Sequence, residues 1–470
     1  MTNTKTLYIA LSLGFALWTN TALANDAADS AVSPQDKGPW YDLDHRDALL
    51  GEMGGGRPWL QNYGITVGLT ETSEVFNSAK GSVERGSNYE GLTTLTLQMD
   101  TKQALGWEGG LFNVSGLDVH GNKFSAKKLD NLQTVSGIEA DNGARLWELW
   151  CQQSLWQDTA DVKIGQQSID QEFMISTNAQ LFANAMFGWP MIPSADMISG
   201  GPSYPLSSLG IRVREHVDDS ITLLGGVFND NPGGLCPTCA GDPQKLNDRG
   251  TNFRLSDNPL YIAEIQYARP GAGDMHNAGQ AETLPGIYRL GAWYDAGQFA
   301  DQEYGTDGLP LATGNGNPRL HHGNYSIYAI ADQMIWRPDA KSSKGLSVFA
   351  GIMGAPQNRN LIDFSLDLGL TYKGIIEGRD DDTLGIGYGL ANVSASDSAF
   401  DRQSGTTPVR SKEQFIEVTY QYQWMPWIQL QPDAQYVFNP GAGVANPNDP
   451  SSVVRLKNET VIGVRTNITF

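Results

Sequence analysis

Charged and aromatic residues recur at every second position in several extended stretches of this sequence, so their side chains share one face of each stretch. Guanidinium and carboxylate groups hydrogen-bond to hydroxyls, and aromatic rings stack on apolar C–H faces. Together they could bind a small polyhydroxylated solute. The residues that the alternation places on this face are Glu148, Gln152, Arg212, Arg214, Glu264, Gln266, Arg289, Trp293, Asp295, Glu417 and Arg465.

Each of these side chains has a structural alternative, because inward-facing charges often form ion pairs with one another. Arg212, Arg214 and Arg289 are the strongest set of candidates for solute contact. Trp189 and Tyr204 lie in a long connection rich in Pro and Gly and are candidate stacking platforms, with loop packing as the alternative.

Signatures of enzymes and of nucleic-acid binding are missing from the sequence. There is no Gly-x-Ser-x-Gly or His-Glu-x-x-His motif, and the 6 histidines do not have the spacing of metal ligands. We therefore expect no catalytic residue, no metal site and no cofactor. The formal net charge of -20 argues against nucleic acid and anionic lipid as partners. The acidic residues most simply form a solvated loop surface. Binding of divalent cations beside lipopolysaccharide is the alternative role.

Period-two alternation is clearest at the C-terminal end of the sequence. Ile462, Val464 and Ile468 share one face of the stretch 461–470, while Arg465 and Asn467 share the other. A terminal phenylalanine preceded by such a pattern resembles the last strand of bacterial outer-membrane proteins. One face suits lipid and the other suits water, and Tyr and Trp fall near the strand ends, as interfacial girdles do.

The same pattern predicts an all-β fold, a 16-stranded antiparallel transmembrane β-barrel over residues 65–470. Such a barrel is wide enough for an aqueous lumen. The longest connection, 170–208, is predicted to fold inward as a constriction loop, with an external cap as the alternative. The predicted strands are 65–76, 92–100, 111–119, 145–156, 161–169, 209–216, 220–229, 260–268, 286–296, 324–337, 345–354, 365–373, 383–391, 413–424, 427–438 and 460–470.

The N-terminal residues have the features of an export signal. Lys5 precedes an apolar run over 7–18, and Ala22 and Ala24 stand at the small-residue positions before a cleavage site. The run is too short to span a bilayer as a helix. We expect residues 1–24 to be a signal peptide and 25–64 to be an N-terminal periplasmic segment.

Cys236 and Cys239 form a Cys-Pro-Thr-Cys motif in a loop rich in Gly and Pro. In an oxidising compartment a disulfide is the expected state of this pair. Free thiols, or metal or redox chemistry, are the alternatives. Cys151 lies in a predicted strand, where it is expected to act as a small apolar side chain.

Several motifs in order along the chain resemble the OprB family of carbohydrate-selective porins. They include Arg-Pro-Trp-Leu at 57–60, Gly-Pro-Ser-Tyr-Pro-Leu at 201–206, Gln-Leu-Gln-Pro-Asp at 429–433 and Arg-Thr-Asn-Ile-Thr-Phe at 465–470. The resemblance implies a sixteen-stranded barrel in the bacterial outer membrane that takes up glucose and related sugars. Outer-membrane lipid and lipopolysaccharide would be its surroundings, and a homo-oligomer is an open alternative.

Other functions stay open at this point. A general porin, or one for other small polar solutes such as organic acids, is the main alternative. An outer-membrane enzyme is a weaker one, given the missing motifs.

Overall fold

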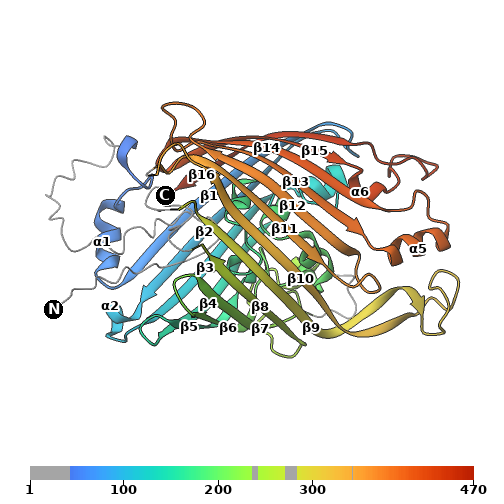
Figure 1. Ribbon diagram of the computed structural model, residues 1–470, viewed down its shortest axis with the longest axis horizontal. Coiled ribbons are helices and arrows are strands. Elements are labelled where there is room, and N and C mark those ends of the chain that lie inside the picture. The colour runs from blue at the N-terminus through green and yellow to red at the C-terminus, as the bar shows by residue number, and fades with distance from the viewer. Residues whose placement is uncertain (1–42, 235–241, 270–282, 341) are drawn as a thin grey trace.

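The computed structural model describes residues 43–234, 242–269, 283–340 and 342–470. They form one closed antiparallel barrel in which each strand pairs with its neighbours in chain order and β1 pairs with β16 (Figure 1). The predicted 16-stranded barrel is thereby confirmed. The predicted signal peptide and the predicted disulfide between Cys236 and Cys239 lie outside the described residues.

Each predicted strand corresponds to one strand of the barrel. The strands are β1 (Ile65–Lys80), β2 (Gly86–Asp100), β3 (Gly110–Gly121), β4 (Gly143–Leu155), β5 (Ala160–Gln167), β6 (Ser208–His216), β7 (Ile221–Asn229), β8 (Pro259–Ala268), β9 (Gly286–Gly305), β10 (Pro318–Trp336), β11 (Gly345–Gly354), β12 (Ile362–Lys373), β13 (Thr383–Val393), β14 (Lys412–Met425), β15 (Ile428–Phe438) and β16 (Glu459–Thr469).

Two hairpins are longer than predicted. β1 and β2 are joined by residues 81–85 only, and β9 and β10 by residues 306–317. In β9 the alternation continues past the predicted end, since Phe299 and Asp301 are buried while Gln298 and Ala300 are exposed. The side-chain period of two therefore sets the strand length here, and Gly297 does not end the strand.

The outer face of the barrel carries exposed aliphatic side chains, among them Leu223, Ile386 and Val464. Exposed tyrosines lie towards the strand ends, as in the pair Tyr267 and Tyr288, whose rings stack at 6.3 Å. Such a belt flanked by aromatic residues is the surface that faces lipid. No helix in the described part of the chain is long and apolar enough to span a membrane.

Short helices lie in the connections. The α-helices are α1 (Gly56–Gln61), α2 (Thr101–Leu105), α3 (Met191–Asp196), α4 (Pro243–Leu246), α5 (Ala395–Ser404) and α6 (Pro440–Gly443). Single turns are η2 (Leu43–His45), η3 (Met53–Gly55), η4 (Ser125–Leu129), η5 (Ile169–Gln171), η6 (Ala179–Leu181), η7 (Ala185–Phe187) and η8 (Ile198–Gly200).

The segment before β1 lies against the seam where the barrel closes. Arg57 of α1 donates from Nη1 to the carbonyl oxygen of Val67 at 3.2 Å and from Nη2 to that of Phe470. Trp59, in contrast, is 59% exposed and contacts Tyr63 edge to face. Arg57 thus ties α1 to the first strand and to the residue that follows the last strand.

Two connections fold into the barrel and fill much of its interior. The first in-folded segment, residues 168–207, joins β5 to β6, and the second, residues 122–142, joins β3 to β4. Apolar residues of the first, such as Phe173, Phe187 and Ile192, form one buried cluster with inward-facing wall residues such as Phe349 and Phe415. Burial of this apolar surface is the main stabilising contribution to the inward fold.

Candidate functional site

Four inward-facing carboxylates accept backbone N–H groups of the first in-folded segment, and we call them the anchor carboxylates. They are Glu148 on β4, Glu264 on β8, Asp332 on β10 and Glu417 on β14. Of these four acceptors Asp332 is ion-paired, with Arg289, and hydrogen bonds to an ionised acceptor are roughly twice as strong as neutral ones. Because the four strands lie at different places around the barrel, the anchor carboxylates hold the segment across the interior (Figure 1).

Asp332 carries the largest share of these contacts. Its carboxylate accepts from the Ser176 hydroxyl at 2.7 Å, from the Asn178 N–H at 3.0 Å and from the Thr177 N–H at 3.1 Å. Arg289 Nη1 pairs with it at 2.9 Å, and both side chains are fully buried. Arg289 Nε and Nη2 have no hydrogen-bond partner in the described part of the chain.

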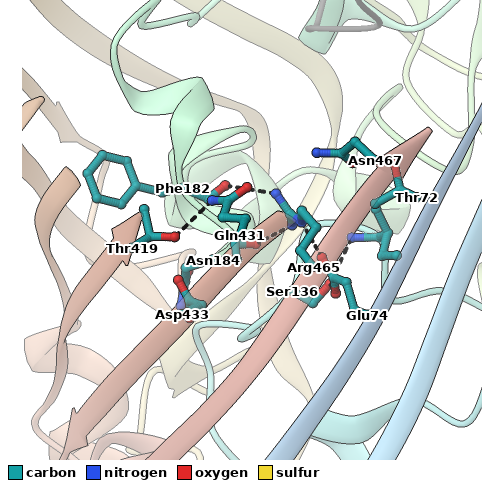
Figure 2. Close-up of polar contacts among 12 residues, drawn as sticks. Thr72, Glu74, Ser136, Phe182, Asn184, Thr419, Gln431, Asp433, Arg465 and Asn467 are labelled. Carbon is teal, nitrogen blue, oxygen red and sulfur yellow. Dashed lines mark hydrogen bonds and ion pairs between the residues drawn. The ribbon is translucent and has the colours of Figure 1, made fainter. Parts of the chain in front are cut away.

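Glu417 and Arg465 both bind the turn at residues 182–184 of the segment. Glu417 accepts hydrogen bonds from its backbone N–H groups, and Arg465 donates to its backbone carbonyl oxygens. Glu417 accepts from the backbone N–H groups of Ala183 at 2.6 Å and Asn184 at 3.0 Å. Arg465 donates to the carbonyl oxygens of Phe182 at 3.4 Å and Ala183 at 3.3 Å (Figure 2). The turn is therefore bound through both its donors and its acceptors.

Arg465 also reaches a second partner set across the barrel seam. Its Nε lies 2.5 Å from Oε1 of Glu74 on β1, and the other oxygen of Glu74 accepts from the Ser136 hydroxyl of the second in-folded segment (Figure 2). The Arg465 side chain stays 11% exposed. One guanidinium thus connects β16, β1 and both in-folded segments.

A separate group of charges, which we call the cationic cluster, joins β5 and β6 to the first in-folded segment. It consists of Lys163 and Asp161 on β5, Arg212 and Arg214 on β6, and Glu172 of the segment. Arg212 is 1% exposed; its Nη1 pairs with Asp161 and its Nε lies 2.6 Å from Glu172. Arg214 pairs with Asp161 at 2.7 Å and keeps 17% of its side chain exposed. Three cations therefore share two carboxylates within the cluster.

Two carboxyl groups of the first in-folded segment are electrostatically distinct. Burial alone would raise the pKa of Glu172, but Lys163, Arg212 and Arg214 outweigh it and lower that pKa to about 2. Burial raises the pKa of Asp196 well above its ordinary value, although the N–H groups of Ile362 and Leu361 oppose the shift. Glu172 is therefore a fixed negative charge of the cationic cluster.

The predicted aromatic residues are packed rather than open. Trp189 is 8% exposed, and its indole N–H donates to the Gly200 carbonyl oxygen at 2.9 Å. The Tyr204 hydroxyl donates to the Ile138 carbonyl oxygen at 2.8 Å, and burial raises its pKa. Trp293 points inward from β9 and is 1% exposed. The contacts of Trp189 and Tyr204 are of the loop-packing kind, and stacking of either ring on a solute stays a prediction.

The structure thus does not bring the predicted residues together at one site. Arg212 and Arg214 meet in the cationic cluster, Glu417 and Arg465 meet at one turn, and Glu148 and Glu264 bind the segment separately. All four predicted arginines form ion pairs. Direct contact of any of these residues with a solute stays a prediction.

The second in-folded segment was missed in the sequence. Leu132 and Gln133 donate their N–H groups to Glu413 at 2.8 and 2.7 Å, and Phe124 and Val135 are fully buried. The two segments also bond directly, through Gly137 N–H to the Ala183 carbonyl oxygen at 2.8 Å. The available signal was the presence of several large apolar residues within residues 122–142, a connection between two predicted strands.

In the described ranges no set of three or more His, Cys, Asp or Glu residues is placed to hold a metal ion. The interior instead offers fixed hydrogen-bond donors and acceptors around a bound segment. That arrangement suits weak, reversible binding of a polar solute.

Comparison with known proteins agrees with this architecture. The model of the family described as carbohydrate-selective porin, OprB family, matches residues 84–470. Porin B of Pseudomonas aeruginosa is 25% identical over 484 residues, which cover 98% of this chain and 99% of the relative. The high pH structure of Pseudomonas putida OprB superposes with a TM-score of 0.76 at 22% identity, covering 90% of this chain and 99% of that one. The chain therefore belongs to the OprB family of carbohydrate-selective porins and forms a channel of the bacterial outer membrane.

Proposed function

We propose that this porin passes monosaccharides such as glucose by facilitated diffusion and that the first in-folded segment forms its constriction. The observation that carries the proposal is the set of anchor carboxylates, which hold residues 168–207 across the interior from four strands. A segment held in this way narrows the path to a defined width. The barrel alone would leave a wide aqueous lumen.

Selectivity for a sugar requires donors and acceptors that exchange with water at little cost. Arg214 and Arg465 combine a fixed position with partial exposure, 17% and 11% of the side chain respectively. Their ion pairs hold each guanidinium in place, so its exposed edge can meet sugar hydroxyls without further loss of side-chain freedom. We therefore propose these two arginines as the first sugar contacts to test.

Passage needs no covalent step, since a channel only lowers the barrier to diffusion. Binding must also be weak enough to release the solute on the far side. Neutral hydroxyls meeting charged donors in a wet site give such weak binding, because each new hydrogen bond replaces one to water.

The test is single-channel conductance of the refolded mature chain in a planar bilayer, titrated with glucose, maltose, an organic acid and a non-sugar polyol. We expect glucose to reduce the ion current saturably at millimolar concentration, and the polyol to have a much weaker effect. Block by the organic acid with no response to glucose would replace the proposal with a porin for small acids.

A further inference from the structure

Two aspartates meet at the end of the barrel where β7 leads into its connection with β8, outside the contacts described so far. Asp230 directly follows β7, and its N–H donates to the Asn258 carbonyl oxygen at 3.0 Å. Asp295 points inward from β9, opposite Leu260 of β8. Both aspartates are 1% exposed, and their carboxyl groups are close enough to interact directly.

This pair lacks the partners that buried carboxylates normally have. Both oxygens of Asp230 and Oδ2 of Asp295 are buried and lack a well-formed hydrogen bond from the described residues; Asn258 supplies the nearest donors to Asp230, and the two carboxyl groups face each other. Oδ1 of Asp295 accepts from the Gly297 N–H at 2.8 Å. No lysine or arginine of the described chain forms an ion pair with either aspartate, whereas nearby Asp257 pairs with Arg254 at 2.6 Å. Two adjacent buried negative charges without compensation are strongly unfavourable.

The surrounding backbone leaves a space between these groups. A methyl group added at Gly297 would lie 3.0 Å from Oδ1 of Asp295, 3.3 Å from Oδ2 of Asp230 and 3.3 Å from the amide nitrogen of Asn258. Side chains from both ends of the β7–β8 connection and from β9 therefore converge on the position that glycine keeps free. Rotation of the Asn258 amide by half a turn presents its oxygen to the same space.

We propose that Asp230, Asp295 and Asn258 bind a calcium ion over Gly297. Carboxylate and amide oxygens are the ligands that Ca²⁺ prefers, and its flexible coordination accepts further oxygens from backbone carbonyls and water. A divalent ion would neutralise the two carboxylates. Mg²⁺ suits the site less, because it demands near-octahedral geometry and gives up water reluctantly.

The consequence for the channel is a fixed connection between β7 and β8. The ion joins the start of the connection between β7 and β8, its end at Asn258, and the wall at β9. The next residue, Asn231, accepts from the Ser199 hydroxyl of the first in-folded segment at 2.8 Å. The site therefore supports the rim against which that segment rests, a role that does not depend on which solute passes.

The test is calorimetric titration of CaCl₂ into the full mature chain, folded in detergent free of lipopolysaccharide and treated with EDTA. We expect one saturable site with a lower affinity for MgCl₂. Asp230→Asn and Asp295→Asn should each weaken Ca²⁺ binding by about tenfold or more, since each removes one of the two charges that attract the ion. Heat-modifiable gel migration verifies that each variant is folded.

Two further variants keep the test decisive. Asp257→Asn is the matched control, since this carboxylate is occupied by Arg254, and its Kd should stay within about threefold of wild type. Gly297→Ala keeps both charges but fills the space, so it should weaken binding as the charge variants do. Absence of saturable Ca²⁺ binding in the wild type, or an unchanged Kd in Asp230→Asn and Asp295→Asn, would overturn the proposal and leave a carboxyl pair that shares a proton.

Discussion

The anchor carboxylates and the cationic cluster both point inward from alternating positions, yet they differ in what lies opposite them. Asp332 and Glu417 face the backbone of the first in-folded segment, whose N–H groups donate hydrogen bonds to their carboxylate oxygens. Arg214, with 17% of its side chain exposed, faces the interior. Alternation therefore identifies the inner face, while the path of the segment decides which inner residues it covers and which keep part of their surface exposed to the interior.

The largest effect is expected from removing an anchor carboxylate. Asp332→Ala deletes the contacts to residues 176–178 and leaves Arg289 buried without its partner. Loss of one partner of a buried ion pair costs about 3–5 kcal/mol. We expect a lower thermal unfolding temperature and a larger, noisier single-channel conductance, measured by circular dichroism and in planar bilayers.

A double substitution separates the loss of contacts to residues 176–178 from the effect of an unpaired buried charge at Arg289. Arg289→Met combined with Asp332→Asn removes the uncompensated charge and should recover part of the stability without recovering the conductance. If Asp332→Ala left both stability and conductance at wild-type values, the anchoring role of this carboxylate would be wrong.

The next effect concerns acid stability of the cationic cluster. The pKa of Glu172 is lowered to about 2, so its ionised form stabilises the fold above its ordinary pKa of 4.5, and this contribution is lost as the pH falls from 4.5 to about 2. The shift corresponds to about 3 kcal/mol. We expect Glu172→Gln to lower the unfolding temperature at pH 6 and to converge with wild type near pH 2. A constant difference across this range would contradict the assignment.

A smaller effect is expected on sugar binding from the partly exposed arginines. Arg214→Gln and Arg465→Gln each remove a charged donor, which is worth about 1.5 kcal/mol or more. The glucose concentration for half-maximal block should rise about tenfold. Arg465→Lys, which keeps the charge but not the fork of donors, should lie between. Unchanged block in both Gln variants would place sugar selectivity elsewhere in the interior.

The smallest effect is expected from the packed aromatic residue Trp189. Trp189→Phe removes the indole donor to the Gly200 carbonyl oxygen while keeping an aromatic ring. The loss should be about 1 kcal/mol in stability, with conductance and glucose block close to wild type. A strong loss of glucose block would instead support the stacking role that the sequence suggested.

The fold was predictable because strand periodicity is a local property of the sequence. Residues 461–470 and 413–438 show their lipid and water faces without any knowledge of their neighbours. Strand ends were less predictable, since β9 continues through Gly297 to Gly305. Gly297 directly follows the predicted end of this strand at residue 296. In the structure it lies within the strand, and its lack of a side chain leaves space beside Asp230 and Asp295.

The interior was only partly predictable. The inner face of Glu148, Glu264 and Glu417 follows from alternation, but their partners are backbone groups of a segment that has no period. Asp332 was overlooked as a contact for the same reason. The inward fold of residues 122–142 depends on contacts with β14 and β1 that are remote in sequence.

The most direct test of this account is to replace residues 174–199 with a short Gly-Ser linker and measure conductance and glucose block. The two ends of the first in-folded segment should stay joined without these residues. The Ile169 N–H donates to the Pro202 carbonyl oxygen at 2.7 Å, and Gln167 pairs with Ser208. We predict an intact barrel with a severalfold larger conductance that glucose no longer blocks. A folded variant with wild-type conductance and wild-type glucose block would contradict the claim that the first in-folded segment forms the constriction.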